Sequence, residues 1–119
     1  DSDKFYLKCN SFQESIAKTY RNLRTDTHFS DVTLVCEEEQ QVQAHRTILA
    51  ACSPFFSNML KKNLHPHPMI FMRGVKAEVL VAIVDFIYNG EVKIHKHDLE
   101  SFLALAQEIR LEGLSKKKG

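Results

Sequence analysis

Residues 29–56 contain the stretch that decides the fold: Phe29-Ser-Asp-Val-Thr-Leu-Val-Cys36, then Glu37-Glu-Glu-Gln40, then Val42-Gln-Ala-His-Arg-Thr-Ile-Leu-Ala-Ala-Cys-Ser-Pro-Phe-Phe56. The segment from Val32 to Cys36 alternates as a half-buried strand does, and Val42 to His45 is placed to return antiparallel to it. The turn between them has no glycine. Ser53 can cap a free amide and Pro54 suits the first helical position, so a helix is predicted from Pro54 to about Lys61, after a buried helix that ends near Cys52.

The flanking segments supply further helices. Apolar residues recur at helical spacing from Ser11 to Arg24, which predicts an amphipathic helix with one apolar stripe. The segment from Met69 to Met72 is typical of a short buried strand. The segment from Glu91 to Ile94 is interpreted as another small strand. Lys76 to Asn89 is apolar on nearly every face and predicts a central helix that Asn89-Gly90 ends. Asp98 can cap a last long helix. The pattern predicts a helix-rich α/β (α+β) domain.

Composition restricts the function classes. The chain has 119 residues, which fits one domain, and a formal net charge of +1, which provides no basic field for nucleic acid. No apolar run reaches the ~20 residues of a membrane span, and the three single cysteines indicate a reducing compartment. We therefore expect no direct contact with nucleic acid or membrane. The predicted divisions are a disordered start at 1–4, a domain at 5–114 and a tail or linker at 115–119.

The stretch at 29–56, together with Asp85-Phe-Ile-Tyr-Asn-Gly-Glu-Val92, resembles the signature of the BTB/POZ domain. The resemblance covers Phe5 to Leu114 and implies a small β-sheet capped by helical hairpins. It also implies a protein-interaction module rather than an enzyme. The residues placed in the structural core are His45, Phe55, Phe56, Phe86 and Tyr88.

The N-terminus adds a narrower likeness. Phe5-Tyr-Leu-Lys-Cys-Asn10 resembles the opening of the tramtrack-type BTB domains of arthropod transcription and chromatin regulators, which usually have tryptophan where this chain has Cys9. The likeness implies a nuclear protein, and the subgroup is associated with assembly beyond dimers. The tryptophan that is absent here could support the contact of that higher assembly.

The N-terminal segments also predict self-association on physical grounds. The apolar stripe of the first helix lies ahead of the core and needs something to cover it, and the extended Phe5–Cys9 carries unpaired backbone groups. In BTB homodimers the matching helix packs on its twin and the matching strand adds to the partner's sheet. The alternative is that both segments fold back on their own domain. The predicted dimer interface comprises Phe5, Leu7, Phe12, Ile16, Tyr20 and Leu23.

Asp31 and Arg46 match a charged pocket near the dimer groove of BTB transcription factors. Such a pocket could receive a co-regulator peptide or organise the dimer. The alternative, which we favour, is a buried ion pair that holds strand to helix, because a buried pair is poor evidence for a binding role.

Other chemistry has weaker support. Asp31, His45 and Cys52 contain the residue types of a thiol catalytic set, but Cys52 is expected to be a small inert hydrophobe and His45 a packed histidine that donates to backbone. The pairs His65/His67 and His95/His97 lack the remaining ligands of a zinc site and are interpreted as solvated loop histidines. No catalytic residue, metal or cofactor is predicted.

Two functional classes remain. In the first, the domain associates with itself or with related BTB domains, offers a surface to co-regulators, and raises the avidity of DNA-binding modules elsewhere in a nuclear regulator. In the second, it is a substrate adaptor of a cullin ubiquitin ligase. Adaptors typically carry a hydrophobic residue, any residue and then glutamate after the third helix, whereas Met59-Leu-Lys-Lys-Asn-Leu-His-Pro66 has no glutamate. The sequence favours the regulator.

Overall fold

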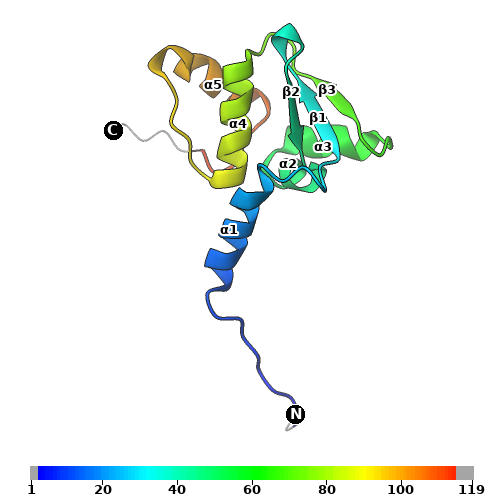
Figure 1. The fold of residues 1–119 in the computed structure, drawn as a ribbon, viewed down its shortest axis with the longest axis vertical. Coiled ribbons are helices and arrows are strands. Elements are labelled where there is room, and N and C mark those ends of the chain that lie inside the picture. Colours follow the sequence, from blue (N-terminus) through cyan, green and yellow to red (C-terminus); the bar gives the residue numbers. More distant parts are fainter. Residues whose placement is uncertain (1–2, 115–119) are drawn as a thin grey trace.

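The computed structural model describes residues 3–114, in which five α-helices pack with a small three-stranded sheet (Figure 1). The order is helix, hairpin, two helices, strand and two helices. The elements are α1 (Phe12–Leu23), β1 (Val32–Val35), the 3-10 turn η1 (Glu37–Glu39), β2 (Gln41–Ala44), α2 (Arg46–Cys52), α3 (Pro54–Lys62), β3 (Met69–Phe71), α4 (Ala77–Asn89) and α5 (Lys96–Glu108).

The sheet has the strand order β2-β1-β3. β1 pairs antiparallel with β2, with Leu34 opposite Val42, and parallel with β3, with Leu34 opposite Ile70. The hairpin turn is built without glycine because Glu38 and Glu39 adopt left-handed backbone angles, with φ of 62° and 59°. The predicted hairpin is confirmed, in a conformation that most side chains disfavour.

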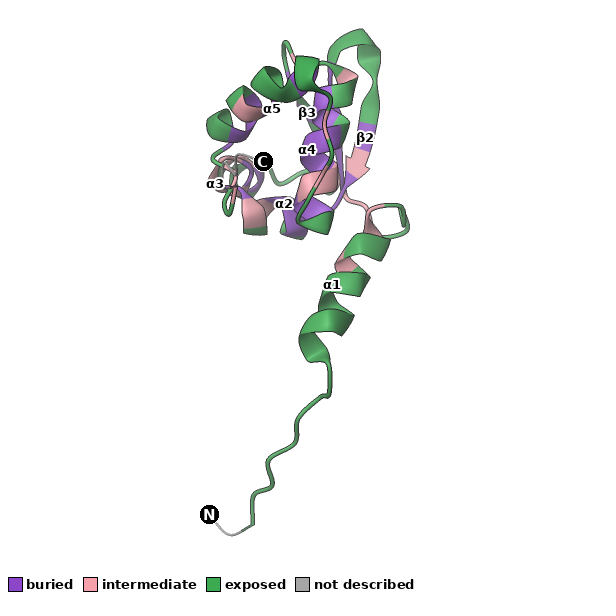
Figure 2. Cartoon of the chain, turned by 90° about the vertical axis from the view of Figure 1, so that its left-hand side faces the viewer, coloured by how far each residue is buried: buried purple, intermediate pink, exposed green. Residues whose placement is uncertain are grey.

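The core lies where α4 packs between the sheet and α5 (Figures 1 and 2). Seven residues of α4 are buried, as its apolar sequence predicts. Phe56, His45 and Tyr88 are also buried, whereas Phe55 and Phe86 are half-buried against the core. Their rings make edge contacts, Phe55 with Phe56 at 5.4 Å and Phe86 with Phe102 at 6.2 Å between ring centroids. All five predicted core residues therefore contact the core.

Local capping chemistry sets the start of α3 and the end of α4. The Ser53 hydroxyl oxygen accepts a hydrogen bond from the Phe56 amide at 3.2 Å, with proline at the first helical position, as predicted. The same hydroxyl donates to the Ile109 carbonyl at 2.6 Å, which ties α3 to the end of α5. Gly90 ends α4 in the left-handed region with φ of 81°. The expectation for Asp98 was wrong, because His95 is the capping residue and Asp98 lies buried in the first turn of α5.

Two strand predictions need correction. Residues 91–94 form no strand, because they have no ladder partner in the described part of the chain. Residues 5–9 are expected to pair with the sheet of a second copy, so in the single chain they have no ladder partner and their strand stays a prediction. β3 was expected to be buried, yet Met69 and Phe71 are exposed and only Ile70 between them is buried. The reason is that successive side chains of a strand point to opposite faces of the sheet, and the face of β3 that carries Met69 and Phe71 is left uncovered.

Candidate functional site

The N-terminal arm and α1 leave large apolar side chains in solvent. Phe5 and Leu7 are 87% and 89% exposed, and Phe12 and Ile16 are 57% and 43% exposed. No residue of α1 is buried. Figure 2 shows the arm and most of α1 in the colour of exposed residues, projecting away from the rest of the domain. The arm and the first half of α1 are therefore an uncovered apolar surface.

The second half of the same stripe docks on its own domain. Tyr20 and Leu23 are half-buried and pack against the core. The guanidinium of Arg24 donates through Nε to Asp85 Oδ1 of α4 at 2.6 Å, which fixes the end of α1. The predicted interface set is thus divided: four residues lie in solvent and two contact the core. The Arg24–Asp85 pair was missed, although a carboxylate in the middle of the apolar helix α4 was a usable signal.

A shallow groove of about 360 Å³ lies between α1 and α4. Its lining includes Phe12, Ile16 and Tyr20 on one side and Ile87 and Tyr88 on the other. The exposed apolar residues of α1 therefore continue into a concave surface. A second apolar helix laid along α1 would cover both at once.

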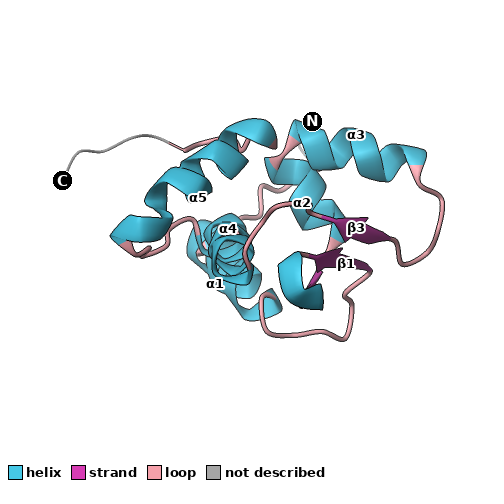
Figure 3. Cartoon of the chain, turned by 90° about the horizontal axis from the view of Figure 1, so that it is seen from above, coloured by secondary structure: helices cyan, strands magenta, loops and turns pink. Residues whose placement is uncertain are grey.

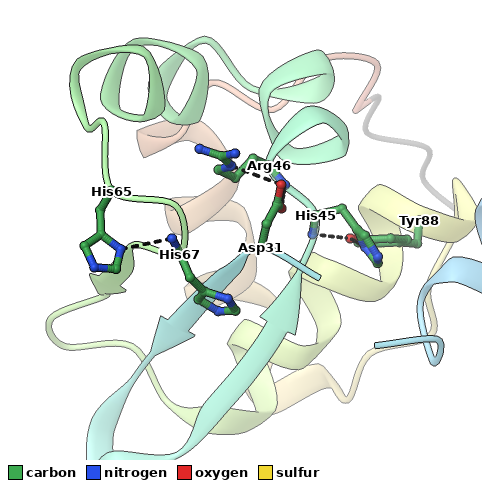
Figure 4. Close-up of polar contacts among 6 residues, drawn as sticks. All are labelled: Asp31, His45, Arg46, His65, His67 and Tyr88. Carbon is green, nitrogen blue, oxygen red and sulfur yellow. Dashed lines mark hydrogen bonds and ion pairs between the residues drawn. The ribbon is translucent and has the colours of Figure 1, made fainter. Parts of the chain in front are cut away.

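Asp31 and Arg46 form the predicted pair, but the pair is not buried (Figure 4). Arg46 Nε donates to Asp31 Oδ2 at 3.0 Å, and the Arg46 backbone amide donates to Asp31 Oδ1 at 2.7 Å. The two side chains are 37% and 34% exposed, so the favoured expectation of a buried pair was wrong in its burial. Asp31 satisfies one of the free amides at the start of α2, which makes it a link between the strand and the helix.

His45 and Tyr88 form a buried polar pair beside this link (Figure 4). The Tyr88 hydroxyl accepts a hydrogen bond from the His45 backbone amide at 2.8 Å and contacts His45 Nδ1 at 2.7 Å. Burial raises the pKa of Tyr88 to about 12. His45 was expected to donate to backbone, but its ring bonds a side chain 43 residues away, which sequence pattern does not reveal.

The other candidate residues do not come together as a reactive set. His45 pairs with Tyr88 and Asp31 with Arg46, while burial raises the pKa of the half-buried Cys52 thiol. His67 is not a solvated loop residue as expected, because its Nε2 contacts the Thr33 hydroxyl at 2.8 Å. Within residues 3–114 no cluster of three or more metal-ligating side chains occurs, and no helix there combines the length and apolar character that a membrane crossing requires.

Comparison with known proteins identifies the family. The BTB/POZ domain profile matches residues 20–118, so the chain belongs to the BTB/POZ family, which confirms the predicted resemblance. The chain is 43% identical to the Broad-complex core protein isoforms of Drosophila melanogaster, over 99% of this chain and 16% of that protein. It is 40% identical to the Longitudinals lacking protein-like of the same species, over 94% of this chain and 87% of that protein. Protein tramtrack, alpha isoform, is 32% identical over 96% of this chain and 14% of its own length.

Solved structures show the same fold. The BTB domain of zebrafish PATZ1 superposes with a TM-score of 0.76 at 20% identity, covering 91% of this chain and 88% of that one. The BTB domain of human gigaxonin gives a TM-score of 0.73 at 24% identity, covering 91% of each chain. The family is one of protein-interaction domains, and this chain is therefore a protein-interaction module.

Proposed function

We propose that this domain dimerises through its N-terminal arm and α1, and that it thereby joins copies of a nuclear transcription or chromatin regulator. The observation that carries the proposal is the uncovered α1: a twelve-residue helix with no buried residue and two exposed large apolar side chains on its stripe. An isolated helix of this length is marginal in water, so its stability has to come from packing. Its own domain covers only the end nearest the core.

A second copy is the occupant that the site fits best. In a twofold dimer each copy presents the same arm, helix and groove, so one arrangement covers both uncovered surfaces. Phe12 and Ile16 of one copy would face the groove between α1 and α4 of the other. The extended residues 5–9 would gain backbone partners from the second copy that they lack in the single chain.

The regulator role is supported by the relatives. The chain spans only 16% of the Broad-complex protein and 14% of tramtrack, so a domain of this kind forms a small part of those proteins. In a long regulator, dimerisation raises the effective concentration of any DNA-binding module linked to the domain. The small net charge of +1 fits a role in which other parts of the protein contact DNA.

The test replaces Phe12 and Ile16 together by aspartate and measures absolute mass by light scattering on a size-exclusion column. We expect the intact domain to be at least a dimer and the Phe12→Asp, Ile16→Asp variant to be a monomer at the same concentration. Loss of two buried apolar side chains costs about 3–6 kcal/mol, a factor of about 10²–10⁴ in the dissociation constant.

A matched control carries the same added charge on another face of α1. Ser15 and Asn22 are exposed and lie outside the apolar stripe. The Ser15→Asp, Asn22→Asp variant should keep the mass of the intact domain. If the intact domain is a monomer throughout, or if both variants keep its mass, the proposed dimer is refuted.

A further inference from the structure

The helix α1 is attached to its own domain near one end. Tyr20 and Leu23 are half-buried, whereas every residue of α1 from Phe12 to Thr19 is exposed. In Figure 1 α1 ends beside the last turns of α4, and in the view from above in Figure 3 the two helices overlap. The direction in which α1 projects is therefore set where its last turn meets α4.

The Arg24–Asp85 pair is the polar part of that attachment. Arg24 is the capping residue at the end of α1, and its Nε donates to Asp85 Oδ1 at 2.6 Å. Apart from Glu78 in the first turn, Asp85 is the only charged residue of α4. The two side chains are 21% and 33% exposed, so solvent screens their charges and the pair adds little to folding stability. A guanidinium N–H donates well only within a narrow range of angles, so the bond does define a direction.

A small change of that direction is magnified at the other end of α1. The rise of the helix places Phe12 about 18 Å from Arg24 along the axis. A rotation of about 10° at Arg24 therefore moves Phe12 by about 3 Å. A gap of about 1 Å already forfeits up to about half of a van der Waals contact. The fit of Phe12 and Ile16 to a second copy thus depends on the angle at which α1 leaves the core.

The groove between α1 and α4 depends on the same angle. One wall of the groove belongs to α1 and the other to the end of α4. Arg24 follows the first wall and Asp85 lies on the helix that forms the second, so the bond between them connects the two walls. A change of angle would alter the exposed stripe and the groove together.

We propose that Arg24 and Asp85 are a positioning pair, whose bond keeps α1 at the angle at which its exposed stripe and the groove fit a second copy. This inference rests on the proposed dimer and adds the residues that prepare each copy for association. Without the bond α1 samples a range of angles, and only copies with the correct angle associate. Because both copies must be competent, a competent fraction of about one third in each weakens the dimer about tenfold.

The first test compares association with folding. Arg24→Met keeps an apolar stem without a donor, Asp85→Ala removes the acceptor, and a third variant combines them. We expect sedimentation equilibrium to show a dissociation constant about tenfold or more higher for each single variant. The double variant should be no weaker than the weaker single variant, because either change removes the same bond.

Folding is measured in the Phe12→Asp, Ile16→Asp background, so that only the monomer contributes. There, urea unfolding should show that each change lowers the folding equilibrium constant by at most about fivefold. Glu100→Ala is the matched control, because it removes the same charge as Asp85→Ala from an exposed position of α5. It should leave both constants unchanged.

The second test measures the direction of α1. Nitroxide labels are placed at Ser15→Cys on α1 and Asn58→Cys on α3, two exposed positions, in the same monomeric background with Cys9→Ser and Cys52→Ser. Pulsed electron paramagnetic resonance then gives the distribution of distances between the labels. We expect one narrow distribution with the pair intact and with Glu100→Ala, and a broad one with Asp85→Ala.

The outcomes separate the positioning role from the dimer. A distance distribution that Asp85→Ala leaves narrow and unshifted overturns the positioning role, as does a broad distribution with an unchanged dissociation constant. A folding constant that falls as far as the dissociation constant rises also overturns it, because the pair then stabilises the fold in general. If the intact domain is a monomer at every concentration, the proposed dimer is refuted instead, and the distance distribution alone decides whether the pair sets the direction of α1.

Discussion

Asp31 acts through two hydrogen bonds of different kinds. Its carboxylate pairs with the Arg46 guanidinium and also accepts the Arg46 amide at the start of α2. Each side chain is about one third exposed, so solvent screens the charge and the ion pair contributes little. The capping bond needs only an oxygen acceptor, which asparagine also provides. The structural role of Asp31 is therefore divided between a weak ion pair and a helix cap.

We predict that Asp31→Asn lowers the free energy of unfolding by about 0.5–1 kcal/mol, because it removes the charge and keeps the cap. Asp31→Ala should cost about 1–2 kcal/mol, because both bonds are lost. Urea unfolding measures both values, with Glu100→Gln as an exposed control. A variant with unchanged unfolding but a lower mass would instead place Asp31 in the dimer contact.

Deprotonation of Tyr88 is expected to lower the folding stability of the domain at alkaline pH. Its pKa is raised to about 12 by burial, against about 10 in an unfolded chain. The folded state thus keeps the proton longer than the unfolded state does, and the resulting stabilisation is complete below pH 10 and lost as the pH rises to 12.

The expected loss across that range is on the order of 2 kcal/mol. Tyr88→Phe should remove this step and should also cost about 1–3 kcal/mol near neutral pH, since the buried His45 amide and ring nitrogen lose their partner. Urea midpoints from pH 8 to pH 11.5 test both effects, with the exposed Tyr6→Phe as the comparison. Equal pH profiles for Tyr88→Phe and the unsubstituted domain would show that Tyr88 does not titrate in this way.

At the scale of elements, sequence pattern succeeds where the determining chemistry is local. The Ser53-Pro54 cap and the left-handed Gly90 each act within one turn of their own helix, so α3 and the end of α4 were predictable. The position of β3 was predicted correctly, but its exposure was not, because an apolar run does not reveal whether both faces of a strand are covered.

The same limit explains what was missed in the candidate site. Arg24 meets Asp85 across 61 residues, and His45 meets Tyr88 across 43. Neither contact follows from a periodicity, because both depend on how α1 and the hairpin dock on α4. By contrast, the apolar stripe of α1 was visible in the spacing of Phe12 and Ile16. The spacing did not show which half of the stripe docks on its own domain, because that depends on where α1 leaves the core in the folded chain.

The whole molecule is more extended than a single globule of its size. A compact chain of this length has a radius of gyration of about 13–14 Å. The observed value is 16.8 Å, with a longest dimension of 61 Å, because the arm and α1 project from the domain (Figure 1). Residues 3–11 are all exposed, so in the single chain they add little to the stability of the core.

This exposure makes the arm a sensitive probe of association. If the arm docks only on a second copy, deleting residues 1–10 should leave the urea midpoint unchanged at low protein concentration and lower it at high concentration. The reason is that dimer formation adds about 1.4 kcal/mol of apparent stability for each tenfold rise in concentration above the dissociation constant. The 119-residue chain with Phe5, Tyr6 and Leu7 replaced by serine should behave like the deletion, because the apolar side chains and not the chain length are expected to be responsible. A deletion that lowers the midpoint equally at every concentration would mean that the arm folds onto its own domain, and the exposed arm would then have no role in joining copies.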